Sequence, residues 1–167
     1  MKNHVKIAVL MGSDSDLPNL RGIFSILDEF KLKYSVRVIS AHRTPDIAAH
    51  FAKTAKENGY EVIICAAGMA AHLAGVIASH TIIPVIGIPM PCPPFDGLDS
   101  LLSTVQMPPG IPVATVTAGK AGAKNAALYA IQILALNDDD LTKKLIRFRA
   151  LQKEKVILAD QDIRNKI

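Results

Sequence analysis

The sequence has only two cysteines among its 167 residues, and it has no tryptophan. Two cysteines cannot form the disulfide framework of a small secreted protein, and the N-terminal residues lack a signal-peptide pattern. We therefore expect a cytoplasmic protein with reduced thiols. No apolar stretch is long and unbroken enough for a transmembrane helix, because Gly, Pro, His and Thr interrupt residues 62–90. We expect no membrane partner.

Aromatic residues are also scarce, with three tyrosines and five phenylalanines in the whole chain. The formal net charge is +4, but the basic residues are dispersed and those of residues 138–167 alternate with acidic ones. Single-stranded nucleic acids are usually bound by clustered basic residues and stacking aromatic rings, and this sequence offers neither. We therefore expect no nucleic-acid partner.

Motifs for several kinds of chemistry are missing. The five histidines include no H-x-x-x-H pair, so we expect no metal site. The first apolar segment is followed by neither a Walker loop nor G-x-G-x-x-G, which disfavours a nucleotide cofactor. No G-x-S-x-G elbow is present, and Cys65 lies in an apolar segment where a thiol would be inert. These absences favour acid–base chemistry without a cofactor.

Apolar, strand-like segments alternate with helix-like ones along the chain. This alternation predicts a doubly wound α/β fold, a three-layer αβα arrangement with a flavodoxin-like, five-stranded parallel sheet. We expect one domain over residues 1–167, an irregular segment at residues 90–96, and an extra C-terminal helix at residues 138–160. The expected strands are residues 5–11, 34–39, 61–66, 84–88 and 113–117, and the helices between them begin near residues 17, 45, 70, 98 and 123.

The segment after the first expected strand carries Ser13, Ser15 and Asp16 directly before a helix start at Leu17 and Pro18. The simplest interpretation is helix capping by Ser13 or Asp16, because such residues are common where helices begin. The alternative is ligand binding, because the carboxyl ends of parallel strands form the ligand edge of such a sheet.

The segment after the second expected strand places Ser40, His42 and Arg43 before a helix start at Thr44 and Pro45. A single loop histidine is more often an ordinary surface residue than a catalyst. Imidazole nevertheless titrates near neutrality, and guanidinium binds phosphate or carboxylate. Both polar segments should meet at one edge of the sheet, and together they indicate an enzyme.

The segment after the third expected strand, AAGMAAHLAG at residues 66–75, is rich in small residues. Small residues let another backbone approach, and amides at a helix start can face an anion. Packing of a helix on the sheet is an equally ordinary explanation, and His72 alone is more typical of a structural histidine than of a ligand.

Five motifs occur in order along nearly the whole chain: GSDSD at residues 12–16, SAHRTP at 40–45, AGMAAHLAG at 67–75, GLDSLLSTVQMPPGIPVATV at 97–116 and GKAGAKNAAL at 119–128. Together these motifs resemble the N5-carboxyaminoimidazole ribonucleotide mutase family. The resemblance implies reversible transfer of a carboxylate from the exocyclic amine of an aminoimidazole ribonucleotide to the adjacent ring carbon, in de novo purine biosynthesis.

The resemblance also implies roles for individual residues. His42 would act as general acid and base, first protonating the carbamate nitrogen to release carbon dioxide and then removing the ring-carbon proton. Asp16 would bind the ribose hydroxyls, because a carboxylate would repel phosphate. The remaining substrate-binding residues would be Ser13, the phosphate ligands Ser15, Ser40 and Arg43, and the base-binding segment that includes Gly68, Ala70 and His72.

The chain departs from the family pattern at Met69 and Ala74, where AGGAAHLPG is usual, and in the proline-rich segment MPCPPFDG. These departures concern the shape of the loops. A related class carboxylates aminoimidazole ribonucleotide directly with carbon dioxide and tends to have Lys after the active-site His, so Arg43 favours the mutase.

The family is typically a homo-octamer, and the apolar residues Leu141, Leu145, Phe148 and Leu151 recur at helical spacing in the last expected helix. We expect this helix to pack on a neighbouring subunit. A rival interpretation is a non-catalytic, flavodoxin-like module that binds a phosphorylated ligand or a flavin, which would not require a reactive histidine.

Overall fold

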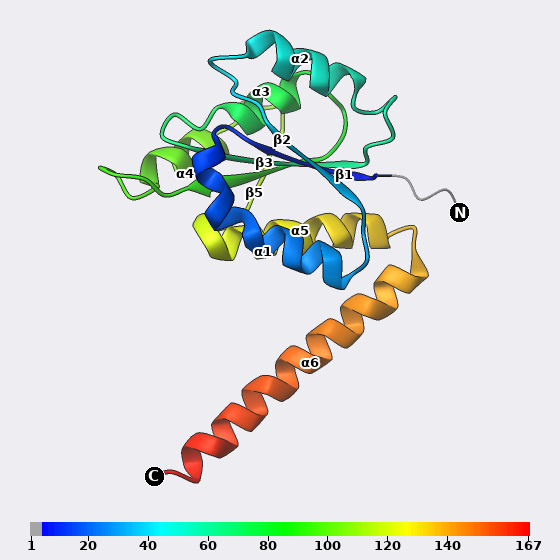
Figure 1. Cartoon of the computed structure of the whole chain (residues 1–167), viewed down its shortest axis with the longest axis vertical. Coiled ribbons are helices and arrows are strands. Elements are labelled where there is room, and N and C mark those ends of the chain that lie inside the picture. Colours follow the sequence, from blue (N-terminus) through cyan, green and yellow to red (C-terminus); the bar gives the residue numbers. More distant parts are fainter. Residues whose placement is uncertain (1–4) are drawn as a thin grey trace. The chain divides into compact units, whose positions relative to one another are not determined.

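The computed structural model describes residues 5–167, and the expectation concerning residues 1–4 at the N-terminus lies outside that range. The chain forms two compact units, one up to Ala130 and one comprising Ile131–Ile167. The first unit contains the whole sheet (Figure 1).

All five strands pair in parallel, in the order β2-β1-β3-β4-β5, which confirms the predicted flavodoxin-like sheet. The last strand is shorter than expected, because only Ala114 and Thr115 are in register with β4. The strands are β1 (Ile7–Met11), β2 (Tyr34–Val38), β3 (Val62–Gly68), β4 (Val85–Met90) and β5 (Ala114–Thr115).

Helices follow the strands, and prolines mark two of their starts, at Pro18 and Pro45. Proline suits the first helical turn because its missing N–H has no intrahelical acceptor there. The helical elements are η1 (Asp14–Asp16), α1 (Leu17–Glu29), α2 (Pro45–Thr54), α3 (Leu73–Ser79), α4 (Leu98–Val105), α5 (Gly119–Ala135) and α6 (Asp139–Arg164).

Two helix starts differ from the expectation. The third helix begins at Leu73 rather than near residue 70, and the irregular segment before it includes Met69, whose backbone is left-handed with φ of 56°. The fifth begins at Gly119 rather than near residue 123. In both places the sequence has a run of small residues, and such a run does not determine the residue at which the helix begins.

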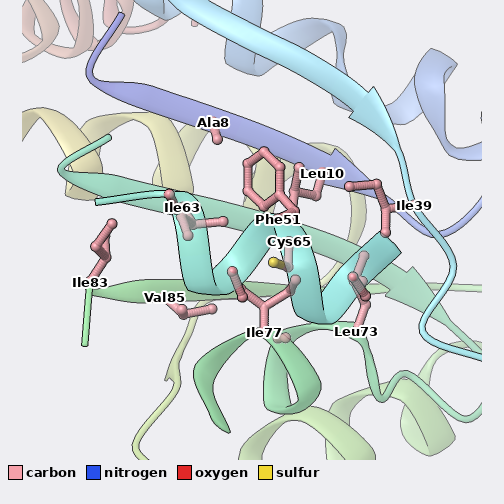
Figure 2. Packing of buried hydrophobic residues seen from close by; sticks show 14 residues of the cluster. Ala8, Leu10, Ile39, Phe51, Ile63, Cys65, Leu73, Ile77, Ile83 and Val85 are labelled. Carbon is pink, nitrogen blue, oxygen red and sulfur yellow. The ribbon is translucent and has the colours of Figure 1, made fainter. Parts of the chain in front are cut away.

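The hydrophobic core on one face of the sheet is formed by alternate strand residues and by α2 and α3 (Figure 2). Ile63 and Cys65 of β3 lie on this face, and Phe51 and Ile77 come from the two helices. Each fully buried aliphatic side chain contributes about 1.5–3 kcal/mol relative to an exposed one. Packing on this face therefore fixes the position of α2, the helix that directly follows residues 40–44.

The opposite face is covered by α1 and the first part of α5, which lie side by side (Figure 1). A Cβ at Gly22 of α1 would lie 2.9 Å from Cγ of Lys124 in α5. Alanines 123, 126 and 127 of α5 are buried, so the close contact rests on small side chains from both helices.

One expectation about the proline-rich segment is wrong at its start. Met90 is the last residue of β4 and is paired with Gly68, and Pro89 is also within the strand. Beyond Gly87, β4 is paired on one side only, because β5 pairs with Ile86 and Gly87 alone, and such a strand edge tolerates proline.

The second unit consists of the end of α5 and the long helix α6. Asp138 caps α6, because its carboxylate accepts hydrogen bonds of 3.0 Å from the amides of Asp140 and Leu141. Acidic residues in the first turn and Arg164 in the last complement the helix dipole. Within residues 5–167, no helix has both the length and the apolar character needed to cross a membrane.

Candidate active site

The loops that leave the carboxyl ends of β1, β2, β3 and β4 surround one cavity of about 560 Å³. This volume is in the usual range for pockets that bind small molecules and cofactors. The lining residues are Gly12, Ser13, Ser15, Asp16, Ser40, Ala41, His42, Arg43, Ala67, Gly68, Met69, Ala70, His72, Leu73, Met90, Pro91 and Cys92.

In the β1 loop, neither Ser13 nor Asp16 caps α1 with its side chain. Ser13 is the cap of η1, where its hydroxyl accepts a hydrogen bond from the Ser15 amide at 3.3 Å. Asp16 precedes α1 but makes no capping bond with its side chain. Its carboxylate lines the cavity and is available to a ligand.

Burial raises the pKa of Asp16 above the usual aspartate value of 3.8, and the nearby charge of Asp14 also raises it. A hydrogen bond with the Ser13 backbone acts in the opposite direction, but it is a smaller effect than burial. A partly desolvated carboxylate gains more from hydroxyl donors than one in open water, because those donors replace lost water contacts.

Hydrogen bonds hold the backbone of the β2 loop, although the side chains of His42 and Arg43 are exposed. Thr44 is bonded to Ser40 three times, because its hydroxyl donates to the Ser40 carbonyl at 2.9 Å and accepts from the Ser40 amide at 3.1 Å, and its amide donates to the same carbonyl. This clamp closes a tight turn that presents His42 to the cavity.

Arg43 connects the second loop with the first. Its Nη2 donates to the Gly12 carbonyl at 3.1 Å, and its Nε donates to the Ser40 hydroxyl at 3.4 Å. The Ser40 hydroxyl also accepts from the Arg43 amide at 3.2 Å, which leaves its proton free to be donated to a ligand. A fixed guanidinium with neighbouring hydroxyls is well suited to a phosphate.

His42 is paired with His72 across the cavity. Its Nε2 lies 2.8 Å from Nδ1 of His72, and the rings meet edge to face with centroids 4.9 Å apart. His72 is in the N-cap position of α3, so the pair joins the loops that follow β2 and β3. Two ring nitrogens at this distance share one proton, which makes one ring the donor and the other the acceptor.

Glycine allows close packing where the third and fourth loops meet. A Cβ at Gly68 would lie 3.2 Å from the Met90 carbonyl oxygen and 3.3 Å from Sγ of Cys92. The amide of Gly12 also donates to the Ala66 carbonyl at 3.0 Å, so the ends of β1 and β3 are tied together. These contacts bring the loops into one cavity wall.

The structure brings all the predicted site residues into this cavity: Ser13, Ser15, Asp16, Ser40, His42, Arg43, Gly68, Ala70 and His72 all line it. Sequence reasoning named no lining residue from the β4 loop, although Met90, Pro91 and Cys92 contribute to it. Their position directly after a predicted strand was the available signal.

Among the described residues, no group of three or more His, Cys, Asp or Glu side chains is arranged to hold a metal ion. Cys65 is fully buried within β3, and burial strongly raises the pKa of its thiol. Cys92 lines the cavity as a free thiol. The polar groups that the predicted site residues offer to a ligand are therefore hydroxyls, one carboxylate, one guanidinium and two imidazoles.

The fold and the cavity define an α/β protein with a candidate ligand site at the carboxyl edge of a parallel sheet. The chain belongs to the AIR carboxylase family, whose profile matches residues 6–155.

Curated relatives from archaea and bacteria match along most of the chain. The N5-carboxyaminoimidazole ribonucleotide mutase of Pyrococcus abyssi is 54% identical over 144 residues, which are 86% of this chain and 82% of the relative. The protein of that name from Bacillus subtilis is 50% identical over 151 residues, covering 90% of this chain and 93% of the relative. The one from Escherichia coli K12 is 48% identical over 155 residues, covering 93% and 92%.

Solved structures give the same fold. The crystal structure of Treponema denticola PurE is 29% identical in sequence and superimposes with a TM-score of 0.85, covering 95% of this chain and 98% of that chain. The crystal structure of a substituted form of Treponema denticola PurE2 gives a TM-score of 0.86 at the same identity and with the same coverage.

Proposed function

We propose that the protein converts N5-carboxyaminoimidazole ribonucleotide to 4-carboxy-5-aminoimidazole ribonucleotide, a step in the synthesis of the purine nucleotide IMP. The relatives named as mutases of this ribonucleotide match most of the chain at 48–54% identity. The observation that carries the mechanism is the position of His42, which lines the cavity in contact with His72 and beside Arg43. The reaction moves a carboxylate within one molecule and requires no cofactor.

His42 is the general acid and base of this proposal. It gives a proton to the carbamate nitrogen as the nitrogen–carbon bond breaks, which leaves carbon dioxide and aminoimidazole ribonucleotide in the cavity. The ring carbon then attacks carbon dioxide, and His42 takes back a proton from that carbon. No net proton or electron is consumed, and the two intermediates react fastest if neither leaves.

The phosphate of the ribonucleotide is bound by Arg43, Ser15 and Ser40. Arg43 is held by its bonds to Gly12 and Ser40, so its guanidinium loses little freedom when phosphate arrives. The hydroxyls supply hydrogen bonds without adding charge. Asp16 accepts hydrogen bonds from the ribose hydroxyls, with Ser13 beside it on the same loop.

The base and the migrating carboxylate lie against residues 68–72. Gly68 and Ala70 present backbone without a large side chain, so amides in this loop can approach the carboxylate. His72 keeps the imidazole of His42 in contact with this part of the cavity. In this proposal, the acid–base group lies beside the atoms that exchange the carboxylate.

Conversion of N5-carboxyaminoimidazole ribonucleotide by wild type and by the His42→Asn variant tests the proposal. Loss of general acid–base catalysis should lower kcat by about 10²–10⁴-fold while the fold and ligand affinity are kept. His50→Asn is the matched control, because His50 is an exposed histidine on α2 and does not line the cavity. A His42→Asn variant with wild-type kcat would contradict the role of His42.

A second candidate function is direct carboxylation of aminoimidazole ribonucleotide by carbon dioxide, which the description of the matched family as AIR carboxylase favours. Supplying aminoimidazole ribonucleotide with bicarbonate in a parallel assay separates the two reactions. Turnover only in that assay identifies the carboxylase. Turnover in neither assay, with tight binding of a phosphorylated ligand or flavin, identifies a binding module instead.

The protein is a cytoplasmic homo-octamer in this proposal, with the helix of residues 138–160 packed on a neighbouring subunit. Both cysteines are free, as expected of a protein in a reducing compartment. Large apolar side chains are exposed on α6, including Ile146 at 66% and Val156 at 69%, and others are exposed on α4. Exposed apolar surface of this kind is typical of subunit interfaces. Sedimentation equilibrium tests the assembly, and the mass of a monomer would contradict it.

A further inference from the structure

Among residues 5–167, the buried polar residues are Ser100 and Thr104, and both lie on α4. Burial of a hydroxyl costs free energy unless the hydroxyl forms hydrogen bonds. Thr104 meets this need within its own helix, because its hydroxyl donates to the Ser100 carbonyl at 2.7 Å. The hydroxyl of Ser100 reaches outside α4, which calls for a separate explanation.

The Ser100 hydroxyl joins the start of α4 to the end of β4. It lies 3.0 Å from the carbonyl oxygen of Met90 and 3.0 Å from that of Gly97, so its one proton is shared between two acceptors. The Gly97 carbonyl also accepts a hydrogen bond from the Leu101 amide at 2.9 Å, within the first turn of the helix. The bond to Met90 is therefore the one that links two elements of the fold.

Met90 is the first of three consecutive residues that line the cavity, residues 90–92, which we call the β4 wall. Pro91 and Cys92 begin the segment that joins β4 to α4. The end of this segment returns to its beginning, because a Cβ at Gly97 would lie 3.1 Å from Cα of Pro91. The Ser100 hydroxyl closes the segment at this base.

The β4 wall is also in close contact with the wall that follows β3. Met90 pairs with Gly68 in the sheet. A Cβ at Gly68 would lie 3.2 Å from the Met90 carbonyl oxygen, which is the atom that accepts the bond from Ser100, and 3.3 Å from Sγ of Cys92. A small displacement of Met90 therefore changes the space beside Gly68 as well.

We propose that Ser100 is a positioning residue, whose hydroxyl fixes the β4 wall of the cavity without touching the ligand. This inference rests on the proposed function, in which the base of the ribonucleotide lies against Gly68, next to this wall. Ser100 is fully buried and does not line the cavity, so it acts through the Met90 carbonyl. Loss of its hydroxyl weakens binding of the substrate and of the transition state alike, because the acid–base group is untouched.

The first test compares the steady-state kinetics of wild type and Ser100→Ala with N5-carboxyaminoimidazole ribonucleotide. Loss of one hydrogen bond should raise KM by about threefold to tenfold and change kcat by less than about twofold. Thr104→Val is the matched control, because it also removes a buried hydroxyl from α4, but the bond that it breaks lies within the helix. Its KM should stay within about twofold of that of wild type.

The second test requires no turnover and uses Cys92 as a reporter of the β4 wall. Cys92 is a partly exposed free thiol in the cavity, whereas Cys65 is fully buried and burial strongly raises the pKa of its thiol. With an excess of a chromogenic aromatic disulfide, one thiol per folded chain should react. Ser100→Ala should react at least about threefold faster than wild type, and Thr104→Val should react within about twofold of wild type.

Either an unchanged KM or an unchanged thiol reactivity in Ser100→Ala would overturn the inference, as would equal changes in Ser100→Ala and Thr104→Val. Reaction of both cysteines in Ser100→Ala would also overturn it, because the hydroxyl would then maintain the whole fold. Failure of the proposed function is distinguishable from these outcomes. In that case wild type would not convert the ribonucleotide, and the thiol test alone would decide whether Ser100 fixes the β4 wall.

Discussion

The Nε2 atom of His42 lies 2.8 Å from Nδ1 of His72, although the two residues are 30 positions apart in the sequence. In the sheet, β2 and β3 lie on either side of β1, and all three are parallel. The loops that follow β2 and β3 therefore leave the same edge of the sheet and line one cavity. One ring of the pair must donate and the other accept. His72 therefore influences the orientation of the proposed acid–base group.

Replacing His72 with asparagine should lower kcat by up to about tenfold, which is the kinetic equivalent of one ordinary hydrogen bond. The loss should be clearly smaller than that of His42→Asn, because His42 itself remains to transfer protons. Steady-state conversion assays of both variants provide the comparison. If His72→Asn were as inactive as His42→Asn, His72 would itself have to take part in proton transfer.

Replacing Arg43 with lysine should raise KM for the ribonucleotide by about tenfold and change kcat by less than about threefold. Lysine keeps the charge but cannot bond to Gly12, Ser40 and a phosphate with one planar group. Arg21→Lys on the exposed surface of α1 is the control. A fall in kcat with unchanged KM would place Arg43 in the chemical step instead.

Asp16 should make stability depend on pH. Because its pKa is raised mainly by burial, the folded state binds this proton more tightly than the unfolded chain does. That contribution is fully present below the ordinary aspartate pKa of 3.8 and is lost as pH rises through the raised value. At neutral pH the ionised, partly buried carboxylate therefore costs stability.

The Asp16→Asn variant should consequently have a thermal midpoint higher than wild type at neutral pH, by up to about 2 °C. The difference should vanish in acid, where Asp16 is protonated in wild type. Thermal unfolding at several pH values measures it, with Glu57→Gln as an exposed control outside the cavity. A difference that grew as the pH fell would show that burial does not control this carboxylate.

Replacing Gly87 with alanine should destabilise the fold by about 1–3 kcal/mol, because a Cβ there would clash with Cγ2 of Thr104. Thr104 is buried, and its hydroxyl is bonded to the Ser100 carbonyl, so it has little freedom to move. Gly75→Ala is the matched control in α3, where the new Cβ would meet the flexible side chain of Met107. Urea unfolding that found equal losses would contradict this explanation.

Much of the fold follows from local patterns. Nearly continuous apolar segments bounded by glycine or proline predict buried parallel strands, and β1 and β3 are almost wholly buried as expected. The polar residues that follow β1 and β2 predict a shared ligand edge. Ser13, Asp16, His42 and Arg43 could be placed together for that reason before any contact was known.

Other features depend on geometry that one sequence does not contain. The sequence is compatible with capping of the helix at Leu17 by Ser13 or by Asp16, but Ser13 caps the separate turn η1 and Asp16 makes no side-chain capping bond. The His42–His72 contact requires the strand order as well as the strand positions. The backbone of Met69 is also unexpected, because methionine has no preference for positive φ.

Every residue that lines the cavity belongs to residues 12–92. Later residues contact the residues that line the cavity. For example, Gly97 and Gly119 pack closely against Pro91. Evolution can therefore alter much of residues 93–167, including the exposed apolar surface of α6, without replacing a group that meets the ligand. The proposed chemistry and the proposed assembly are therefore free to diverge at different rates.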